Sequence, residues 1–259
     1  MALSVAIIAL DEENDLPGCL ASVGFADEVV LVDSGSSDAT PAIAREAGAR
    51  VLQHPFTGFS EQKQFACDST TGDWILVLDA DEKAGPGLAR AVSRGIDSGS
   101  ASAYRIARRT VYMGRVLRFG PWGGDRPLRL FRRGCARFGS ETVHESLRAD
   151  RPAPVLRGGY LEHRPYRDFR EHMEKMARYS SLWAAQQSTA GRRASRLDLL
   201  LRPQWRLFRG AVLQLGLLDG LPGLAASFSS AVYAYWKYMA LYEIAGTGRG
   251  PAGPGESRG

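Results

Sequence analysis

The sequence predicts an α/β protein that begins with a doubly wound, Rossmann-like mixed sheet flanked by helices and ends in a helical extension. Short apolar runs alternate with segments of helical spacing through the first part of the chain. Acidic residues follow three of these runs, at Asp11, Asp33 and Asp79. After His163 the pattern becomes helical. Alternation of strands and helices builds a sheet with helices on both faces, which gives this fold class.

The first half supplies four strands and three helices. The strands are expected at Val5–Leu10, Glu28–Val32, Arg50–His54 and Trp74–Leu78, and the helices at Leu16–Val23, Thr40–Ala47 and Ser60–Ser69. Each apolar run is too short for a buried helix and stops at a polar loop, as a buried parallel strand does. Pro17 and Pro41 stand in the first turns of their helices, where a missing N–H is harmless.

The acidic loops predict a ligand site. In doubly wound sheets ligands bind beyond the carboxyl ends of the strands, so the loops at Asp11, Asp33 and Asp79 should line one crevice. Asp79 and Asp81 flank Ala80 directly after a strand. Alternate carboxylates on a tight turn can share a hard divalent cation that bridges two phosphates. Acidic pairs are also common at ordinary turns, so the triplet alone leaves that alternative open.

The rest of the chain adds further strands and then helices. We expect a helix at Pro86–Asp97, strands at Ala103–Arg108, Leu128–Arg132 and Val155–His163, and helices at Phe169–Gln187, Trp205–Leu215 and Leu224–Ile244. A glycine- and tryptophan-containing loop spans Phe119–Asp125. This pattern predicts an α/β domain at 1–165, a helical region at 166–245 and a disordered tail at 246–259, which is nearly all Gly, Pro, Ser and charge.

Charge is divided unevenly along the 259 residues, whose net charge is +5. Residues 1–100 hold 6 basic and 16 acidic side chains, and the remainder holds 27 and 12, so the parts carry about −10 and +15. An acidic half suits a cation, and an arginine-rich half suits an anionic substrate or surface. A solvated basic face is the alternative.

The C-terminal helices are aromatic and lie next to arginines. Leu221–Ile244 contains Pro222, Lys237 and Glu243, which make it a poor membrane-spanning helix. Six arginines precede it, namely Arg192, Arg193, Arg196, Arg202, Arg206 and Arg209. The combination fits a monotopic helical hairpin at a lipid headgroup layer. Helices that cover the core or form a homodimer interface fit equally well.

The cysteines and the N-terminus favour the cytoplasm. Cys19, Cys67 and Cys135 are odd in number and lack metal-site spacing, so we expect reduced thiols. Met1–Leu10 has no basic leader and no small-residue cleavage site, so we do not expect a signal peptide.

Six motifs carry a family resemblance. They are Ile7–Asn14, Ala26–Asp38, Gln62–Ala66, Gly72–Glu82, Leu128–Arg133 and Val143–Ser146. Together they resemble family 2 glycosyltransferases of the nucleotide-diphospho-sugar transferase (GT-A) fold, over nearly the full chain. Within that family the sequence is similar to lipopolysaccharide core glycosyltransferases of the WaaE/KdtX kind.

The resemblance implies an enzyme, its substrates and its cofactor. It implies inverting transfer of a hexose, with glucose as the first candidate, from a UDP-sugar with Mn²⁺ or Mg²⁺. The acceptor would be a lipopolysaccharide core or a related glycolipid or oligosaccharide. The enzyme would then work as a peripheral protein on the inner face of the cytoplasmic membrane, and residues 1–165 would be its catalytic domain.

The resemblance also implies nucleotide contacts. Glu12 and Asp33 should contact the nucleoside, and Gly35 should let the backbone approach it. Lys63 should meet uracil or phosphate, with an ordinary surface lysine as the alternative. The family usually has Asn-Glu where this chain has Asp11-Glu12, which leaves the role of Asp11 open.

The catalytic base and the metal site follow from the same resemblance. Glu145 takes the position of the base that deprotonates the acceptor hydroxyl. A structural carboxylate paired with an arginine is the alternative. His163 should bind the metal with Asp79 and Asp81, although a lone histidine is often structural. His144 could orient Glu145 or touch phosphate.

The glycine-containing loop should border the donor sugar. Trp122 offers a stacking face, Gly123 and Gly124 admit close approach, and Asp125 offers a carboxylate to sugar hydroxyls. A plain turn with a packed tryptophan is the alternative. The nearby arginines could serve acceptor phosphates or face solvent; they are Arg126, Arg129, Arg132 and Arg133.

Other function classes fit less well. A polyprenyl-phosphate glycosyltransferase would share the fold and differ in the acceptor. A nucleotidyltransferase should carry a Gly-rich phosphate loop after the first strand, where this chain has acids. A non-enzymatic basic module for membranes or nucleic acid would have no use for Asp79, Asp81, Glu145 and His163 together, so we expect no nucleic-acid partner.

Overall fold

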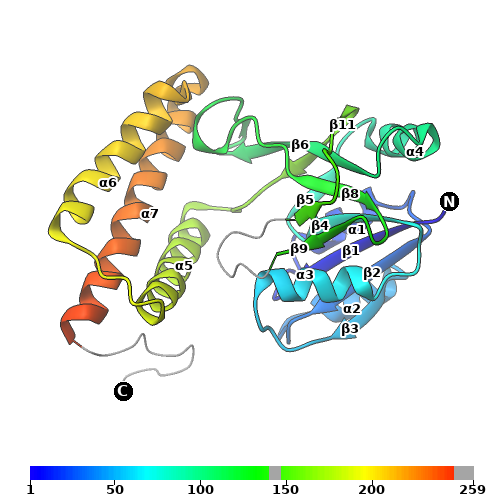
Figure 1. Cartoon of the computed structure of the whole chain (residues 1–259), viewed down its shortest axis with the longest axis horizontal. Coiled ribbons are helices and arrows are strands. Elements are labelled where there is room, and N and C mark those ends of the chain that lie inside the picture. Colours follow the sequence, from blue (N-terminus) through cyan, green and yellow to red (C-terminus); the bar gives the residue numbers. More distant parts are fainter. Residues whose placement is uncertain (140–146, 248–259) are drawn as a thin grey trace. The chain divides into compact units, whose positions relative to one another are not determined.

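The computed structural model describes residues 1–139 and 147–247, which fall into two compact units (Figure 1). The sheet unit comprises Met1–Arg109 and Asp125–Arg164, and the helical unit comprises Thr110–Gly124 and the residues from Pro165 onward. The segment 110–124, which lies inside the expected 1–165 domain, therefore groups with the helices. The tail expected to be disordered lies almost entirely outside the described residues.

The sheet is mixed, as the sequence predicts. Its strands follow the order β3-β2-β1-β4-β8-β6-β11-β5, with β7 paired to β6 off this path. The strands are β1 (Leu3–Ala9), β2 (Glu28–Asp33), β3 (Arg50–Gln53), β4 (Trp74–Asp79), β5 (Glu82–Ala84), β6 (Ala103–Tyr112), β7 (Arg115–Val116), β8 (Leu128–Arg132) and β11 (Val155–His163). β1 to β4 are parallel, β8 is antiparallel to β4 and β6, and β5 is antiparallel to β11. β9 (Ala136–Phe138) and β10 (Leu147–Ala149) form a separate antiparallel pair.

Helices cover both faces of this sheet because alternate strand residues point to opposite sides. One core joins β1 residues such as Val5 and Ile7 to side chains of α1, α2 and α4. The other joins Ala6 and Val77 to α3. The helices are α1 (Leu16–Ser22), α2 (Thr40–Glu46), α3 (Phe59–Asp68) and α4 (Leu88–Ser98). Strands buried on both faces explain the unbroken apolar runs in the sequence.

The strand register brings the acidic strand ends together. Ala9 at the end of β1 lies opposite Asp33, and Ile8 lies opposite Asp79 on the other side. Neighbouring strands are about 4.8 Å apart, so the two carboxylates leave the same edge of the sheet one strand on either side of β1. These strand ends therefore converge as predicted, and the ligand crevice between the three loops stays a prediction.

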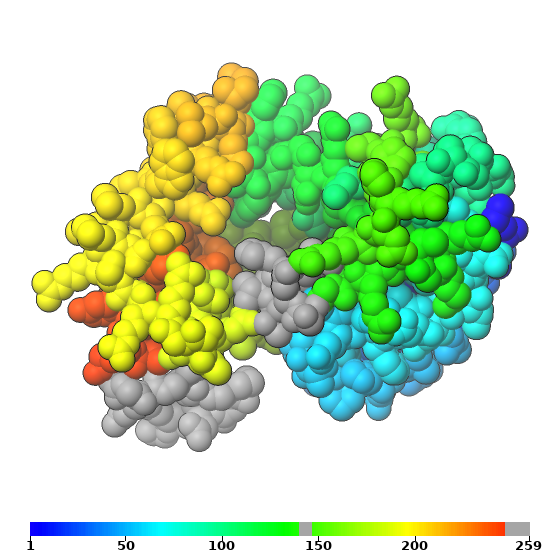
Figure 2. Space-filling model, in the orientation of Figure 1, coloured from blue at the N-terminus to red at the C-terminus, as the bar shows by residue number. Residues whose placement is uncertain are grey.

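The helical unit is built on a long helix flanked by two others. Its helices are α5 (Phe169–Thr189), α6 (Arg196–Phe208), the π-helical η2 (Arg209–Leu213), the 3₁₀ turns η1 (Gly120–Trp122) and η3 (Gly216–Asp219), and α7 (Gly220–Thr247). Both α5 and α6 pack against α7. Figure 2 shows side chains of α6, in yellow, standing out from the surface of this unit.

The helix expected at Trp205–Leu215 is wrong in both bounds. α6 begins nine residues earlier, at Arg196, because Ser195 and Asp198 form a capping box that satisfies the first N–H groups. It runs through Pro203 and ends at Phe208. Beyond it the chain passes through η2 to Leu215, whose backbone is left-handed (φ 59°). Four short strands, β5, β7, β9 and β10, also lack a sequence prediction.

No single helix in the described ranges is long and apolar enough to cross a membrane. Arg196–Leu213 and Gly216–Gly246, bent by 66° at their break, pass that test of length and composition only as a pair.

Candidate active site

Asp79, the last residue of β4, lies between two cations. One carboxylate oxygen is 2.6 Å from Lys63 Nζ, and the other accepts a hydrogen bond from Arg129 at 2.7 Å. Burial disfavours its ionised form, but attraction to Arg129 and Lys63 outweighs burial and holds the pKa of Asp79 far below its usual range. Asp79 is therefore an anion that fixes the two cations at this strand end.

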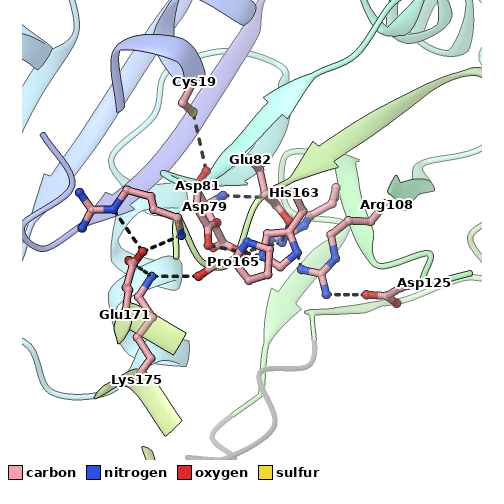
Figure 3. A network of polar contacts seen from close by, with 12 residues as sticks. Cys19, Asp79, Asp81, Glu82, Arg108, Asp125, His163, Pro165, Glu171 and Lys175 are labelled. Carbon is pink, nitrogen blue, oxygen red and sulfur yellow. Dashed lines mark hydrogen bonds and ion pairs between the residues drawn. The ribbon is translucent and has the colours of Figure 1, made fainter. Parts of the chain in front are cut away.

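Glu82 extends this ion-pair network into the core (Figure 3). Its side chain is fully buried and accepts hydrogen bonds from Arg129 at 2.7 Å and from Arg108 at 3.1 Å. Its second oxygen accepts from the Asp79 N–H at 3.1 Å. Arg108 reaches on to Asp125 at 2.5 Å. The alternating charges order the turn Asp79–Glu82 before any ligand binds.

Asp81 and His163 form a separate pair on the same turn. His163 Nε2 lies 3.3 Å from Asp81 Oδ2, because β11 pairs with β5 and places His163 opposite Glu82. The other polar atoms, Asp81 Oδ1 and His163 Nδ1, are buried and have no hydrogen-bond partner among the described residues. Leaving buried polar atoms unpaired costs stability, so such atoms point to a missing ligand.

This pair fits a divalent cation. A carboxylate with an imidazole nitrogen suits Mn²⁺ better than Mg²⁺, which strongly prefers oxygen ligands. The described ranges contain no group of three or more His, Cys, Asp or Glu side chains arranged to hold a metal. A cation here would therefore complete its coordination with phosphate oxygens and water. Both carboxylate oxygens of Asp79 already contact cations, Lys63 and Arg129, so the role of Asp79 as a third metal ligand stays a prediction.

The two acidic loops after β1 and β2 are hydrogen-bonded to each other. Asp11 accepts from the Ser37 N–H at 2.7 Å, and its own N–H donates to Ser36 Oγ at 2.9 Å. The Glu12 N–H donates to Thr40 Oγ1 at 2.8 Å. These bonds hold Asp11 in a left-handed conformation (φ 56°), which aspartate tolerates better than most residues. In this chain Asp11 therefore braces the second loop.

Asp33 folds the loop that follows it. Its buried carboxylate accepts from the N–H groups of Gly35 and Ser36 at 3.2 Å and from the Ser36 hydroxyl at 2.5 Å. Gly35 has a φ of 95°, and a side chain there would point into open space. The predicted contacts of Glu12, Asp33 and Gly35 with a nucleoside, and of Lys63 with uracil or phosphate, stay predictions.

Gln62 joins the same region and was missed as a functional candidate. Its side chain is fully buried and donates to Ser34 Oγ and to the His54 carbonyl, both at 3.0 Å. Its carbonyl oxygen lies 2.9 Å from His54 Nδ1. The sequence shows only that Gln62 lies next to Lys63 in a predicted helix, which does not by itself indicate that its side chain is buried and hydrogen-bonded to these loops.

Of the four candidates in the glycine-containing loop, Trp122, Gly123 and Gly124 belong to the helical unit and Asp125 belongs to the sheet unit. Trp122 packs edge-on against Tyr112 at 5.0 Å between ring centroids, in a cluster with Tyr166 and His172. A side chain at Gly123 would collide with the backbone of Phe119, and Gly124 has a φ of 71°. Both glycines are thus required by the turn. Stacking of Trp122 on a sugar stays a prediction.

The assigned base, Glu145, and its neighbour His144 lie outside the described residues, so their roles also stay predictions. Arg129 differs from expectation: the sequence left it facing acceptor phosphates or solvent, whereas its side chain is buried and ion-paired. The sequence does contain an indication of this burial, because an arginine inside the apolar run Leu128–Phe131 needs a carboxylate partner.

Cys19 lies under this site without taking part in its chemistry. Its thiol lies 3.7 Å from the Asp79 carbonyl oxygen. Burial, followed by the nearby carboxylates of Glu82, Asp81 and Asp79, raises the pKa of Cys19 far above its usual value. The thiol therefore stays protonated and is neither a nucleophile nor a metal ligand at neutral pH.

Comparisons with known proteins agree with this fold. The family model described as "Glycosyl transferase family 2" matches residues 4–144. The lipopolysaccharide core biosynthesis glycosyltransferase LpsC of Rhizobium meliloti (strain 1021) is 32% identical over 251 residues, which cover 94% of this chain and 93% of LpsC. An uncharacterized glycosyltransferase of Rickettsia typhi (RT0209) is 26% identical and covers 93% of this chain and 86% of its own.

The crystal structure of S. aureus TarS 1–349 superposes with a TM-score of 0.51 at 16% identity, covering 96% of this chain and 92% of that one, and supports the fold alone. The family match and the identity to LpsC over nearly the whole of both chains go further. This chain belongs to glycosyl transferase family 2 and is a glycosyltransferase.

Proposed function

We propose that this enzyme transfers a hexose, with glucose as the first candidate, from a UDP-sugar to a lipopolysaccharide-core or related glycolipid or oligosaccharide acceptor. The transfer inverts the anomeric centre and depends on a divalent metal. The name of LpsC, a lipopolysaccharide core biosynthesis glycosyltransferase, supports the acceptor class, because that relative aligns over almost its full length. The three free cysteines, two of them buried, suit the reducing cytoplasm and hence the inner face of the cytoplasmic membrane.

The observation that carries the proposal is the pair Asp81 and His163. Each has a buried polar atom without a partner among the described residues, and both lie beside Asp79 at the carboxyl end of β4. They would hold Mn²⁺. When bound, such an ion neutralises negative charge on the departing diphosphate.

The remaining residues bind and orient the donor. Lys63 and Arg129 bring two positive charges to the same strand end, where Asp79 and Glu82 hold them in fixed positions. Such fixed charges stabilise a developing anion without reorganising during the reaction. The braced loops after β1 and β2 present backbone and carboxylate groups to the nucleoside. The acceptor hydroxyl must lose a proton, and we assign that step to Glu145, which lies outside the described residues.

A UDP-release assay tests this function. A panel of nucleotide sugars is offered with a lipopolysaccharide-core acceptor or a polyprenyl phosphate, with Mn²⁺ or with a chelator. We expect release from a UDP-hexose with the core acceptor and Mn²⁺, reduced at least about 100-fold in Asp81→Asn. The matched control is Asp97→Asn, an exposed carboxylate at the end of α4. Full activity of Asp81→Asn, or equal activity under chelation, would contradict the proposal.

A further inference from the structure

The helix α6 carries an apolar stripe that no part of the described chain covers. Leu197, Leu201, Trp205 and Phe208 follow at intervals of four, four and three, and therefore lie on one side of the helix. Their exposed fractions are 64%, 62%, 55% and 48%. None of the 13 residues of α6 is buried. A soluble helix normally turns such a stripe toward the core.

The packing of α6 on α7 does not use this stripe. Leu199, Pro203 and Leu207 repeat every four residues and are half-buried, whereas the stripe residues are exposed. The contacts between α6 and α7 therefore involve the half-buried face. Within residues 1–139 and 147–247 nothing covers the stripe, which leaves it able to meet a surface outside these residues.

The bend after α6 continues the apolar surface. Leu213, Leu215, Leu217, Leu218 and Leu221 are each about half to two-thirds exposed. We call these five residues the elbow. Exposed apolar patches of this extent in a monomer mark an interaction surface.

Positive charge borders the stripe. Six arginines and one aspartate, Asp198, lie between residues 192 and 209. Arg202 and Arg206 fall between the exposed stripe and the half-buried face of α6 in the helical repeat. A helix with leucines and a tryptophan on one side and arginines beside them is typical of a membrane interface.

Lys237 of α7 adds to this charge. Its ammonium group lies 4.3 Å from the centroid of the Trp183 ring and 5.0 Å from that of Tyr233. Burial, and then repulsion by Arg206 and Arg192, lowers the pKa of Lys237 to about 8. Positive charge thus exceeds negative charge around this group, which favours a bound anion.

We propose that the stripe and the elbow insert into the headgroup layer of a bilayer containing anionic lipids, with Arg206, Arg209 and Lys237 binding lipid phosphates. The inference rests on the proposed function, because binding to a bilayer would bring the enzyme to a glycolipid acceptor that lies in a membrane. A second copy fits less well, because a twofold interface would bring the same arginine-rich surfaces together. The excess of positive charge points to an anionic partner.

Vesicle flotation tests the inference. The full-length protein is mixed with vesicles of phosphatidylcholine alone or of equal parts phosphatidylcholine and phosphatidylglycerol. We expect binding to the anionic vesicles, weakened by salt, and about five-fold weaker for each of Arg206→Ala and Arg209→Ala. Trp205→Glu should abolish flotation. Phe56→Glu, which changes an exposed aromatic residue of the sheet unit, is the matched control and should bind like wild type.

Tryptophan fluorescence gives a second readout that does not depend on the variants. Trp205 is exposed, whereas Trp74 and Trp183 are buried and Trp122 and Trp236 are half-buried. We expect a blue shift of Trp205 emission on anionic vesicles and its quenching by brominated lipids. Wild-type protein that neither floats nor shifts, or a dimer in light scattering that Trp205→Glu converts to a monomer, would overturn the inference.

The proposed function is tested separately on wild-type protein by UDP release without vesicles. UDP release without vesicle binding would remove the membrane inference and leave the transferase assignment intact. Vesicle binding without UDP release from any nucleotide sugar would remove the proposed reaction and leave the membrane surface.

Discussion

Replacing Glu82 by glutamine should destabilise the sheet unit through the buried ion-pair network. The substitution keeps the shape of the side chain and one carbonyl oxygen but removes its negative charge. Arg129 and Arg108, which both donate to this carboxylate, would then face each other across a neutral group. The fold itself offers neither of them a second fully buried anion, because Asp79 and Asp125 are partly exposed.

The expected loss follows from burial. The Glu82 side chain is 0% exposed, that of Arg129 is 7% and that of Arg108 is 24%. Removing one partner of a buried ion pair costs about 3–5 kcal/mol. The low end applies here because Arg108 reaches solvent and glutamine still accepts a hydrogen bond. We therefore expect a loss of about 3 kcal/mol, or about 6–12 °C in the melting temperature of a unit of this size.

Circular dichroism melts and urea titrations of wild type and Glu82→Gln measure this loss. The matched control is Glu162→Gln on β11, whose carboxylate pairs with Arg164 at 2.8 Å where both side chains are partly exposed, by 29% and 55%. Such surface pairs contribute at most about 1 kcal/mol. The reasoning is refuted if the Glu82 variant is no less stable than the Glu162 variant.

Four further outcomes are expected. His163→Ala should weaken Mn²⁺ binding in the presence of UDP at least about 10-fold by calorimetry, and unchanged affinity would exclude His163 as a ligand. Lys63→Met should raise the KM for the UDP-sugar about 10-fold or more, because a charged hydrogen bond contributes about 1.5–3 kcal/mol. Asp33→Asn should lower the free energy of unfolding by about 1–3 kcal/mol in urea titrations, because its loop loses part of its acceptor capacity. Burial lowers the pKa of His172 from 6.5 to about 4, so the unfolded chain takes up the proton first as pH falls. The stability that this neutral imidazole confers is complete above pH 6.5 and falls by about 3 kcal/mol as pH falls to about 4. Thermal melts across that pH range should show this loss in wild type, and His172→Phe should remove it.

The strands of the sheet were predictable from sequence where the pattern that marks them lies within the strand and its adjoining loop. β1, β2 and β4 are apolar runs that stop at acidic loops, and their parallel pairing follows from the helices between them. The approach of Asp33 and Asp79 to the same sheet edge could therefore be derived without coordinates. The short strands β5 and β9 could not, because strands of three residues carry no periodicity and form only through pairing with distant residues.

The ion-pair network was not predictable in detail. The acidic turn at Asp79–Glu82 was identified, but four arginines between 126 and 133 were equal candidates as its partners. The antiparallel pairing of β8 with β4 selects among them, since Leu130 lies opposite Leu76 and Arg129 follows toward the carboxyl end of β4. That pairing joins residues about fifty positions apart, and no local pattern encodes it.

In the helical unit the capping box determines where α6 begins. The apolar spacing after Trp205 suggested a helix there, yet Ser195 and Asp198 start α6 earlier, and Pro203 does not stop it. The exposure of the α6 stripe was also beyond the sequence. Periodicity shows that a face is apolar but does not show what covers it.

The most direct test of the central claim is calorimetric titration of UDP into wild type and Asp81→Asn, each with Mn²⁺ and with a chelator. We predict binding to wild type that requires Mn²⁺ and is weakened at least about 10-fold in the variant. Binding of equal strength in all four titrations would contradict a metal-assisted UDP site at Asp81 and His163.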